Sequence, residues 1–352
     1  MLHPDRLFPA DPATRDLARK LFAEVEKLPI VSPHGHTDPR WWGENPHFSN
    51  PAHLFVVPDH YVLRMLISQG VSYEALGIGE GREKDPRKIW RTFAEHFHLF
   101  QGTPSRIWVD HALSEVFGLE ERLSPKNADA QYDRIAECLA KPEFRPRELY
   151  DRFNIEVIAT TDGALDDLHW HQQVLDSDWS GRVVPTYRPD AVIDPEADGF
   201  SEALDKLGEL TGCDTGTWQG YLDAHRARRA FFREMGATAT DHGHPSPRTA
   251  NLSDSEAAAL FDRVRSGRMG DDDADLFRAQ MLTEMAKMSA DDGMVMQLHP
   301  GSYRGHNAAV LSRYGADKGF DIPVAVNFTR GFEAAARFRG HGARSHPHPV
   351  HP

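Results

Sequence analysis

The sequence predicts an α/β protein built on a parallel sheet, and two observations support this fold class: the alternation of its segments and its length. Short β-rich runs that end in polar residues alternate with helical segments along the chain. Strands that alternate with helices at this spacing imply parallel pairing. The length of 352 residues suits one large α/β barrel as easily as two smaller domains. The strands are expected at Leu28–Ser32, 153–162, 182–190, 236–244 and 293–301.

The first strand follows an amphipathic helix, "PATRDLARKLFAEVEKLPI", and precedes a long stretch of different texture. From about residue 40 to 150 the chain has helical periodicity and almost no strand signal. Within it Ile89, Phe93, Phe97 and Phe100 share one stripe, which predicts core packing. We therefore expect a helical insertion after the first strand.

Polar residues stand where the predicted strands end. In a parallel barrel, catalytic groups gather at the strand ends where the following loops begin. The residues at these positions are His34, His36, Asp162, Arg188, Asp241, His242 and His299. This repeated coincidence predicts a functional site at one edge of the sheet.

The motif "SPHGH" places two histidines one residue apart directly after the first strand. Side chains at i and i+2 of an extended chain point to the same side, so His34 and His36 could grip one divalent ion. The alternative is a polar turn that carries two unrelated histidines.

Composition excludes several classes of function. A formal net charge of −13 argues against nucleic acid and anionic membranes as partners. No apolar run approaches the ~20 residues of a membrane span, and the N-terminus lacks the apolar segment of a signal peptide. Cys138 and Cys213 are too few for a disulfide framework. We expect a soluble, cytoplasmic protein.

The motifs taken together resemble the uronate isomerases of the amidohydrolase superfamily. They are "HGH" at 34–36, "DHYVLR" at 59–64, "TTDGALDDL" at 160–168, "YRPD" at 187–190, "DHG" at 241–243 and "QLHPG" at 297–301. The resemblance implies an incomplete (β/α)8 TIM-like barrel of the metal-dependent hydrolase type, with a helical insertion after the first strand. The expected segments are an N-terminal helix and first strand (1–38), the insertion (39–150), the remaining βα units (151–335) and a non-family, disordered tail (336–352).

The resemblance also implies a reaction on a small hexuronate substrate. Uronate isomerases interconvert D-glucuronate with D-fructuronate, and D-galacturonate with D-tagaturonate, by proton transfer through an enediol. The implied cofactor is a divalent metal, expected to be zinc. The implied roles are metal binding by His34 and His36, catalysis by Tyr61 and His299, and substrate binding by Arg188, His60, Asp241 and His242.

Several of these residues also have structural interpretations. Tyr61 could be a packed aromatic, and Arg188 could form an ion pair with Asp190 or Asp162. Asp241 could cap the following helix. The two histidines of "HWH", at 169 and 171, are expected to be surface residues.

The chain stops before the eighth strand, where the family supplies a metal-binding aspartate and a substrate-binding arginine. We therefore expect this chain to have little isomerase activity by itself. The run "IPVAVNF" (322–328) is expected in a loop that leads into the fifth helix. A metal-dependent hydrolase and an inactive fragment are the alternative functions, and a homo-oligomer is left open.

Overall fold

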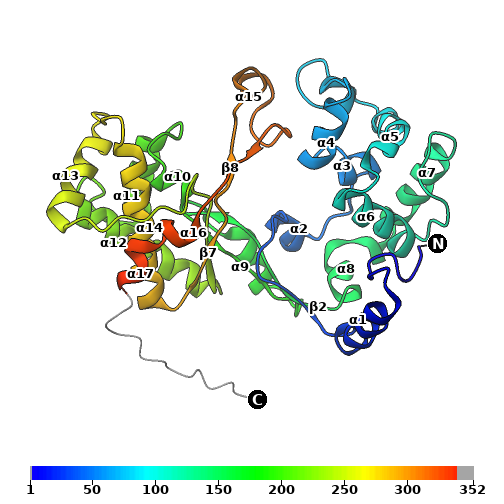
Figure 1. Ribbon diagram of the computed structural model, residues 1–352, viewed down its shortest axis with the longest axis horizontal. Coiled ribbons are helices and arrows are strands. Elements are labelled where there is room, and N and C mark those ends of the chain that lie inside the picture. The colour runs from blue at the N-terminus through cyan, green and yellow to red at the C-terminus, as the bar shows by residue number, and fades with distance from the viewer. Residues whose placement is uncertain (1, 339–352) are drawn as a thin grey trace. The chain divides into compact units, whose positions relative to one another are not determined.

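The computed structural model describes residues 2–338, and the chain divides into two compact units. We call the first the helical unit, which comprises residues 2–31, Glu44–Glu156 and Tyr303–Ile322. The second is the sheet unit, which comprises Ser32–Gly43, Val157–Ser302 and residues 323–338. Figure 1 labels the helices and some of the strands of the two units.

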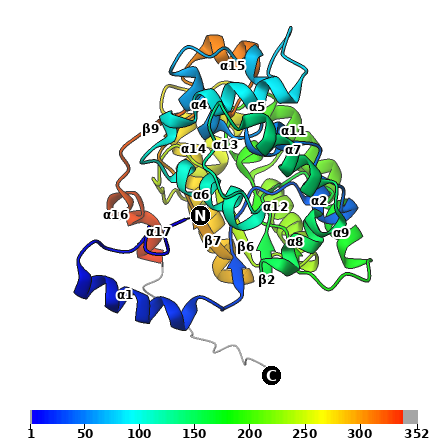
Figure 2. The ribbon, with the colours of Figure 1, turned by 90° about the vertical axis from the view of Figure 1, so that its right-hand side faces the viewer.

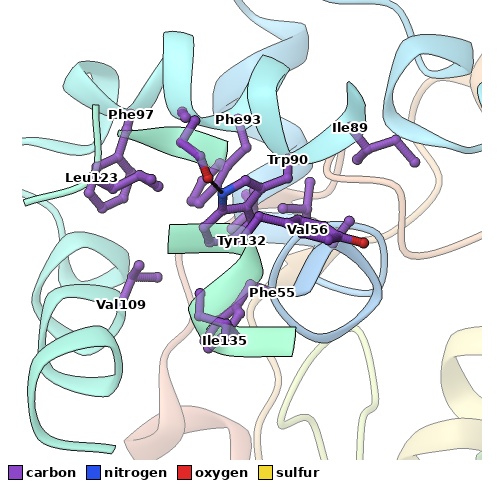
Figure 3. Packing of buried hydrophobic residues seen from close by; sticks show 14 of the residues in the cluster. Phe55, Val56, Ile89, Trp90, Phe93, Phe97, Val109, Leu123, Tyr132 and Ile135 are labelled. Carbon is purple, nitrogen blue, oxygen red and sulfur yellow. Dashed lines mark hydrogen bonds between the residues drawn. The ribbon is translucent and has the colours of Figure 1, made fainter. Parts of the chain in front are cut away.

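The helical unit is built around one aromatic core. Ile89, Trp90 and Phe93 are almost completely buried, and so are Phe97 and Phe100, which confirms the predicted stripe. Figure 3 shows the rings of this core, in which the indole N–H of Trp90 donates to a backbone carbonyl 3.0 Å away. The helices of the unit are α1 (Pro12–Val25), α3 (Pro51–Phe55), α4 (His60–Ile67), α5 (Pro86–Glu95), α6 (Pro104–His111), α7 (Ala128–Leu139), α8 (Pro146–Arg152) and α15 (Ala308–Tyr314), with short turns at Glu74–Leu76, Phe97–Phe100, Ala112–Val116 and Pro142–Phe144.

The strands confirm the predicted parallel pairing. One sheet has the order β1-β2-β4, a second has the order β3-β5-β6-β7, and β8 pairs with β9. All registered pairs in the first two sheets are parallel, and β6 and β7 can be followed in Figure 2. The strands are β1 (Ile30–Ser32), β2 (Ile155–Ala159), β3 (Asp162–Gly163), β4 (Val183–Val184), β5 (Tyr187–Arg188), β6 (Ala239–His242), β7 (Val295–Leu298), β8 (Ser302–Tyr303) and β9 (Ile322–Pro323).

The helices of the sheet unit supply its apolar core. Phe232 of α12, Phe261 of α13 and Phe277 of α14 are fully buried in one cluster with Tyr187 of β5. The packing of long helices against parallel strands is the expected layer arrangement of an α/β fold. The helices are α2 (Pro39–Glu44), α9 (His169–Leu175), α10 (Asp190–Ile193), α11 (Phe200–Thr211), α12 (Trp218–Glu234), α13 (Asp254–Arg265), α14 (Asp273–Asp292), α16 (Phe328–Gly331) and α17 (Glu333–Phe338).

Each of the five predicted β-rich runs contains a strand, but two runs are divided. The run 153–162 holds β2 and the first residue of β3, and the run 182–190 holds β4 and β5. Pro185 separates β4 from β5, since a proline cannot donate to the ladder. The run 322–328 forms no long strand, because β9 has only two residues. Helix α16 begins at Phe328, the last residue of the run. Most of the expected disordered tail, 339–352, lies outside the described residues.

Across residues 2–338, no helix combines the length and the apolar character needed to cross a membrane.

A buried polar network lies at the junction of β2, β3 and β5. The Thr160 hydroxyl donates to Asp162 (2.7 Å) and lies 2.8 Å from Nε2 of His171, while the Thr186 N–H donates to the same carboxylate. His171 is 1% exposed, so the expectation that it lies on the surface is wrong. Helix α9 turns His171 toward the sheet, whereas the side chain of His169 stays exposed.

We predict that Asp162→Asn changes how stability depends on pH. Burial raises the pKa of Asp162 to about 6, against the opposing hydrogen bonds from Thr160 and Thr186. Between the unfolded and the folded pKa of such a carboxyl, the folded state binds more protons than the unfolded state. The free energy of unfolding therefore falls as pH rises through this range. Between pH 5 and pH 8 the free energy of unfolding of wild type should therefore fall relative to D162N by about 1 kcal/mol.

Urea unfolding of both proteins at the two pH values measures this difference. Asp178→Asn, which alters an exposed carboxylate, is the control and should show no such change. An identical pH dependence for D162N and wild type would contradict the prediction.

Candidate functional site

The loop after β1 that carries the two histidines is tied to neighbouring strands. The Thr161 hydroxyl donates to the Gly35 carbonyl (2.8 Å), and the Gln297 amide donates to the Pro33 carbonyl (2.8 Å). A Cβ atom added at Gly35 would lie 3.0 Å from the Ala159 carbonyl oxygen. The middle glycine of "HGH" thus allows a close backbone approach, which holds the flanking histidines at the strand ends.

The carboxylate of Asp241, at the end of β6, lies between two histidines. Nε2 of His299 lies 2.7 Å from Oδ1 of Asp241, and Nε2 of His34 lies 3.3 Å from the same oxygen. The ligand atoms of these three residues are all within 4.8 Å of one another. They form the only group of three or more potential metal ligands among the described residues. We call His34, Asp241 and His299 the carboxylate–histidine group.

The environment of Asp241 fits a bound cation. Its side chain is fully buried, and within residues 2–338 neither carboxylate oxygen makes a well-directed hydrogen bond, although Nε2 of His299 lies 2.7 Å from Oδ1. Burial alone would raise the pKa of Asp241, but the contact with His299 and the charges of Arg188 and His34 lower it overall. An ionised carboxylate beside imidazole nitrogens is a donor set that divalent metals accept.

The i, i+2 prediction for the first histidine pair is consistent with the geometry. The rings of His34 and His36 have centroids 5.0 Å apart, and the ring of His299 lies 5.6 Å from that of His34. Burial lowers the pKa of His36, and the neighbouring His34 and Arg188 lower it further. A lowered pKa favours the neutral imidazole, which is the form that binds a metal.

The contact between Asp241 and His299 lowers the pKa of Asp241 and raises the pKa of His299. The contact with Asp241 raises the pKa of His299, although burial opposes the shift. The charged form of this imidazole is thus stabilised next to a carboxylate, on the rim that also holds His34 and His36.

Arg188, at the end of β5, contacts two carboxylates. Its Nε donates to Oδ2 of Asp190 (2.8 Å), and its Nη1 lies 3.4 Å from Oδ2 of Asp241. The ion pair with Asp190 that we considered as a structural role therefore forms, whereas Asp162 belongs to the Thr160 network. Arg188 is nevertheless placed against the carboxylate–histidine group, because Asp241 belongs to it.

The geometry does not give His242 the expected contact with a substrate. Its ring is completely buried, and Nε2 lies 3.0 Å from the Thr240 hydroxyl. Neighbouring residues of a strand point to opposite faces, so the same register that turns Asp241 toward His34 turns His242 away. Asp241 also lies inside β6 and caps no helix.

His60 and Tyr61 belong to the helical unit, where they begin α4. The Asp59 side chain accepts from the backbone N–H groups of Tyr61 and Val62, so the "DHY" motif is a helix N-cap. Tyr61 is 62% exposed and its ring lies 4.2 Å from that of His60. Exposure argues against the packed-aromatic interpretation of Tyr61, and its catalytic role remains a prediction.

Asp190 and Gly243 lie near Arg188 and receive no site role from the sequence motifs. Asp190 accepts from the Gly243 N–H (3.1 Å) as well as from Arg188, so it bridges the ends of β5 and β6. Both residues stand in the motifs "YRPD" and "DHG", which was the available signal. The bridge itself depends on strand order, which the motifs do not contain.

Comparison with known proteins agrees with this arrangement. A family model described as glucuronate isomerase matches residues 12–334. A uronate isomerase of Rhizobium meliloti (strain 1021) is 61% identical over 332 residues, which cover 93% of this chain and 71% of that protein. A uronate isomerase of Mesorhizobium japonicum is 60% identical and covers 92% and 70%.

Solved structures give the same result. The crystal structure of glucuronate isomerase from Caulobacter crescentus matches with a TM-score of 0.94 and 51% identity, covering 97% of this chain and 72% of that one. The uronate isomerase of Thermotoga maritima matches with a TM-score of 0.87 and 28% identity, covering 94% and 72%. The fold is an incomplete (β/α)8 barrel of the amidohydrolase type, whose parallel strands form the two sheets described above. The family-model match and the shared identity show that this chain belongs to the glucuronate isomerase family, whose members are aldose–ketose isomerases.

Proposed function

We propose that this chain interconverts D-glucuronate with D-fructuronate, and D-galacturonate with D-tagaturonate. The observation that carries the proposal is the placement of Arg188 beside the carboxylate–histidine group. A permanently charged guanidinium fork matches the carboxylate of a uronate. A cluster of ionisable groups beside it suits the proton transfers of an isomerase.

The isomerisation moves a carbonyl by one carbon without oxidant or reductant. A base removes the C2 proton of the aldose while O1 gains a proton, which gives an enediol. A proton then returns to C1 as O2 loses its proton, which gives the ketose. We assign the proton carriers as His299 and Tyr61, with His60 and Asp241 holding substrate hydroxyls.

We assign the metal site to His34 and His36, and zinc as the ion. Two imidazoles suit zinc, and the buried Asp241 carboxylate 3.3 Å from His34 adds a compensating negative charge. When bound, the ion would supply a positive charge that polarises substrate oxygens.

A coupled assay tests the proposed function. D-Glucuronate is supplied to the zinc-loaded chain, and D-fructuronate is reduced by mannonate dehydrogenase as NADH absorbance falls. We expect NADH oxidation that depends on the chain and is lost in His34→Ala. Hydrolysis of an ester or amide without uronate turnover would instead favour the metal-dependent hydrolase. NADH oxidation no faster than that of His34→Ala would contradict the proposed function.

We predict that Asp241→Asn weakens zinc binding at least about tenfold, because carboxylates that orient or compensate metal-binding histidines are typically worth 10–100-fold in affinity. Competition with a chromogenic chelator measures the dissociation constant. The control is Asp167→Asn, which alters an exposed carboxylate of the sheet unit paired with His169. Equal zinc affinity in D241N and D167N would contradict a link between Asp241 and the ion.

We predict that Arg188→Lys raises KM for D-glucuronate about tenfold or more. Lysine keeps the charge but loses the two parallel N–H donors that a carboxylate accepts. Arg91→Lys is the matched control, because Arg91 makes a two-pronged contact with Asp129 in the helical unit. An unchanged KM in R188K would return Arg188 to a purely structural role.

A further inference from the structure

We propose that Asp190 is a positioning residue for uronate binding, and that it acts together with Gly243 by fixing the guanidinium of Arg188. The inference rests on the proposed function, in which Arg188 binds the substrate carboxylate. It adds a residue that touches no substrate but decides which nitrogens of Arg188 the substrate meets.

Both carboxylate oxygens of Asp190 are in use. Oδ2 accepts from Nε of Arg188 (2.8 Å), and Oδ1 accepts from the backbone N–H of Gly243 (3.1 Å). The second contact anchors Asp190 to the residue that follows β6. Because the Gly243 N–H fixes the carboxylate of Asp190, this carboxylate can fix the guanidinium of Arg188 in one position.

The contact at Nε selects the free edge of the guanidinium. A carboxylate ligand takes two N–H groups that lie side by side, either Nε with Nη2 or Nη1 with Nη2. Asp190 occupies Nε, whereas Nη1 and Nη2 make no hydrogen bond within residues 2–338, so this pair can bind the substrate carboxylate. Nη1 is the nitrogen that lies 3.4 Å from Asp241, so this edge adjoins the carboxylate–histidine group.

Gly243 sets the space in which the guanidinium lies. A Cβ atom at this position would be 2.6 Å from Nη2 of Arg188, 2.7 Å from Oδ2 of Asp190 and 3.2 Å from Cε1 of His299. The backbone of Gly243 does not require glycine, since its φ is outside the left-handed region. The requirement is therefore steric, and any side chain must displace Arg188 or Asp190.

Loss of Asp190 has two opposing effects on an anionic substrate. Removing a negative charge would favour the substrate, but this charge is partly exposed and therefore screened. Without Asp190, Arg188 has one remaining carboxylate neighbour, the buried Asp241, and would turn toward it. Misplacement of the donor pair then outweighs the relief of repulsion.

Calorimetric titration of the zinc-loaded chain with D-glucuronate tests the inference. We expect Asp190→Asn and Gly243→Ala each to raise Kd about tenfold, the scale of one charge-assisted hydrogen bond. Because G243A leaves every charge unchanged, it measures positioning alone. The controls are Asp194→Asn, at the other end of α10 and paired with Arg278, and Gly163→Ala, where an added Cβ has no atom within 4 Å; both should keep the wild-type Kd.

The Arg188→Ala background separates positioning from other roles. If Asp190 acts through Arg188, D190N should add no further change in that background. An unchanged or lower Kd in D190N, or an equal effect of D190N with and without Arg188, would overturn the inference. A wild-type chain that binds no uronate would overturn the proposed function instead. Thermal unfolding of each variant identifies loss of folding. If G243A does not fold, the comparison of D190N in the wild-type and R188A backgrounds still decides the question.

Discussion

The site depends on the buried carboxylate of Asp241. A fully buried charge is costly unless other charges or a metal compensate it. The structure provides His299 at 2.7 Å, His34 at 3.3 Å and Arg188 at 3.4 Å, each from a different strand end. The three contacts have a structural consequence as well as a chemical one: they connect the ends of β5, β6 and β7 with the loop after β1. The buried charge of Asp241 is therefore costly for folding, but its contacts hold the strand ends of the site together.

Hydrogen bonds between uncharged groups hold the strand ends and the histidine loop in position. Backbone pairing of β6 with β7 places Asp241 opposite Gln297, whose side chain holds the Pro33 carbonyl of the histidine loop. Thr161 holds the same loop at Gly35. The functional side chains are thus carried on short strands and on loops that are bonded to those strands, which is how a parallel α/β fold achieves rigid sites at its strand ends.

Asp241 and Asp162 are both buried strand aspartates, and their partners distinguish them. Asp241 meets charged groups, and His299, Arg188 and His34 together outweigh burial, so that its pKa is lowered. Asp162 meets neutral groups, a threonine hydroxyl and a backbone N–H, and burial raises its pKa to about 6. Asp241 can therefore interact with a cation and a substrate, whereas Asp162 stabilises the contact between neighbouring strands.

The sequence alone determined the α/β class, the parallel strands, the aromatic core of the helical unit and the positions of His34, His36, Arg188, Asp241 and His299. These features follow from periodicity and from strand-end placement, which are local properties of the chain. Only the tertiary structure decided that His171 is buried, that His242 faces away from the rim and that Asp190 bridges two strand ends. Which face a residue presents depends on register and on what packs against its element. Pairing of neighbouring strands joins residues that lie between 25 and 56 positions apart.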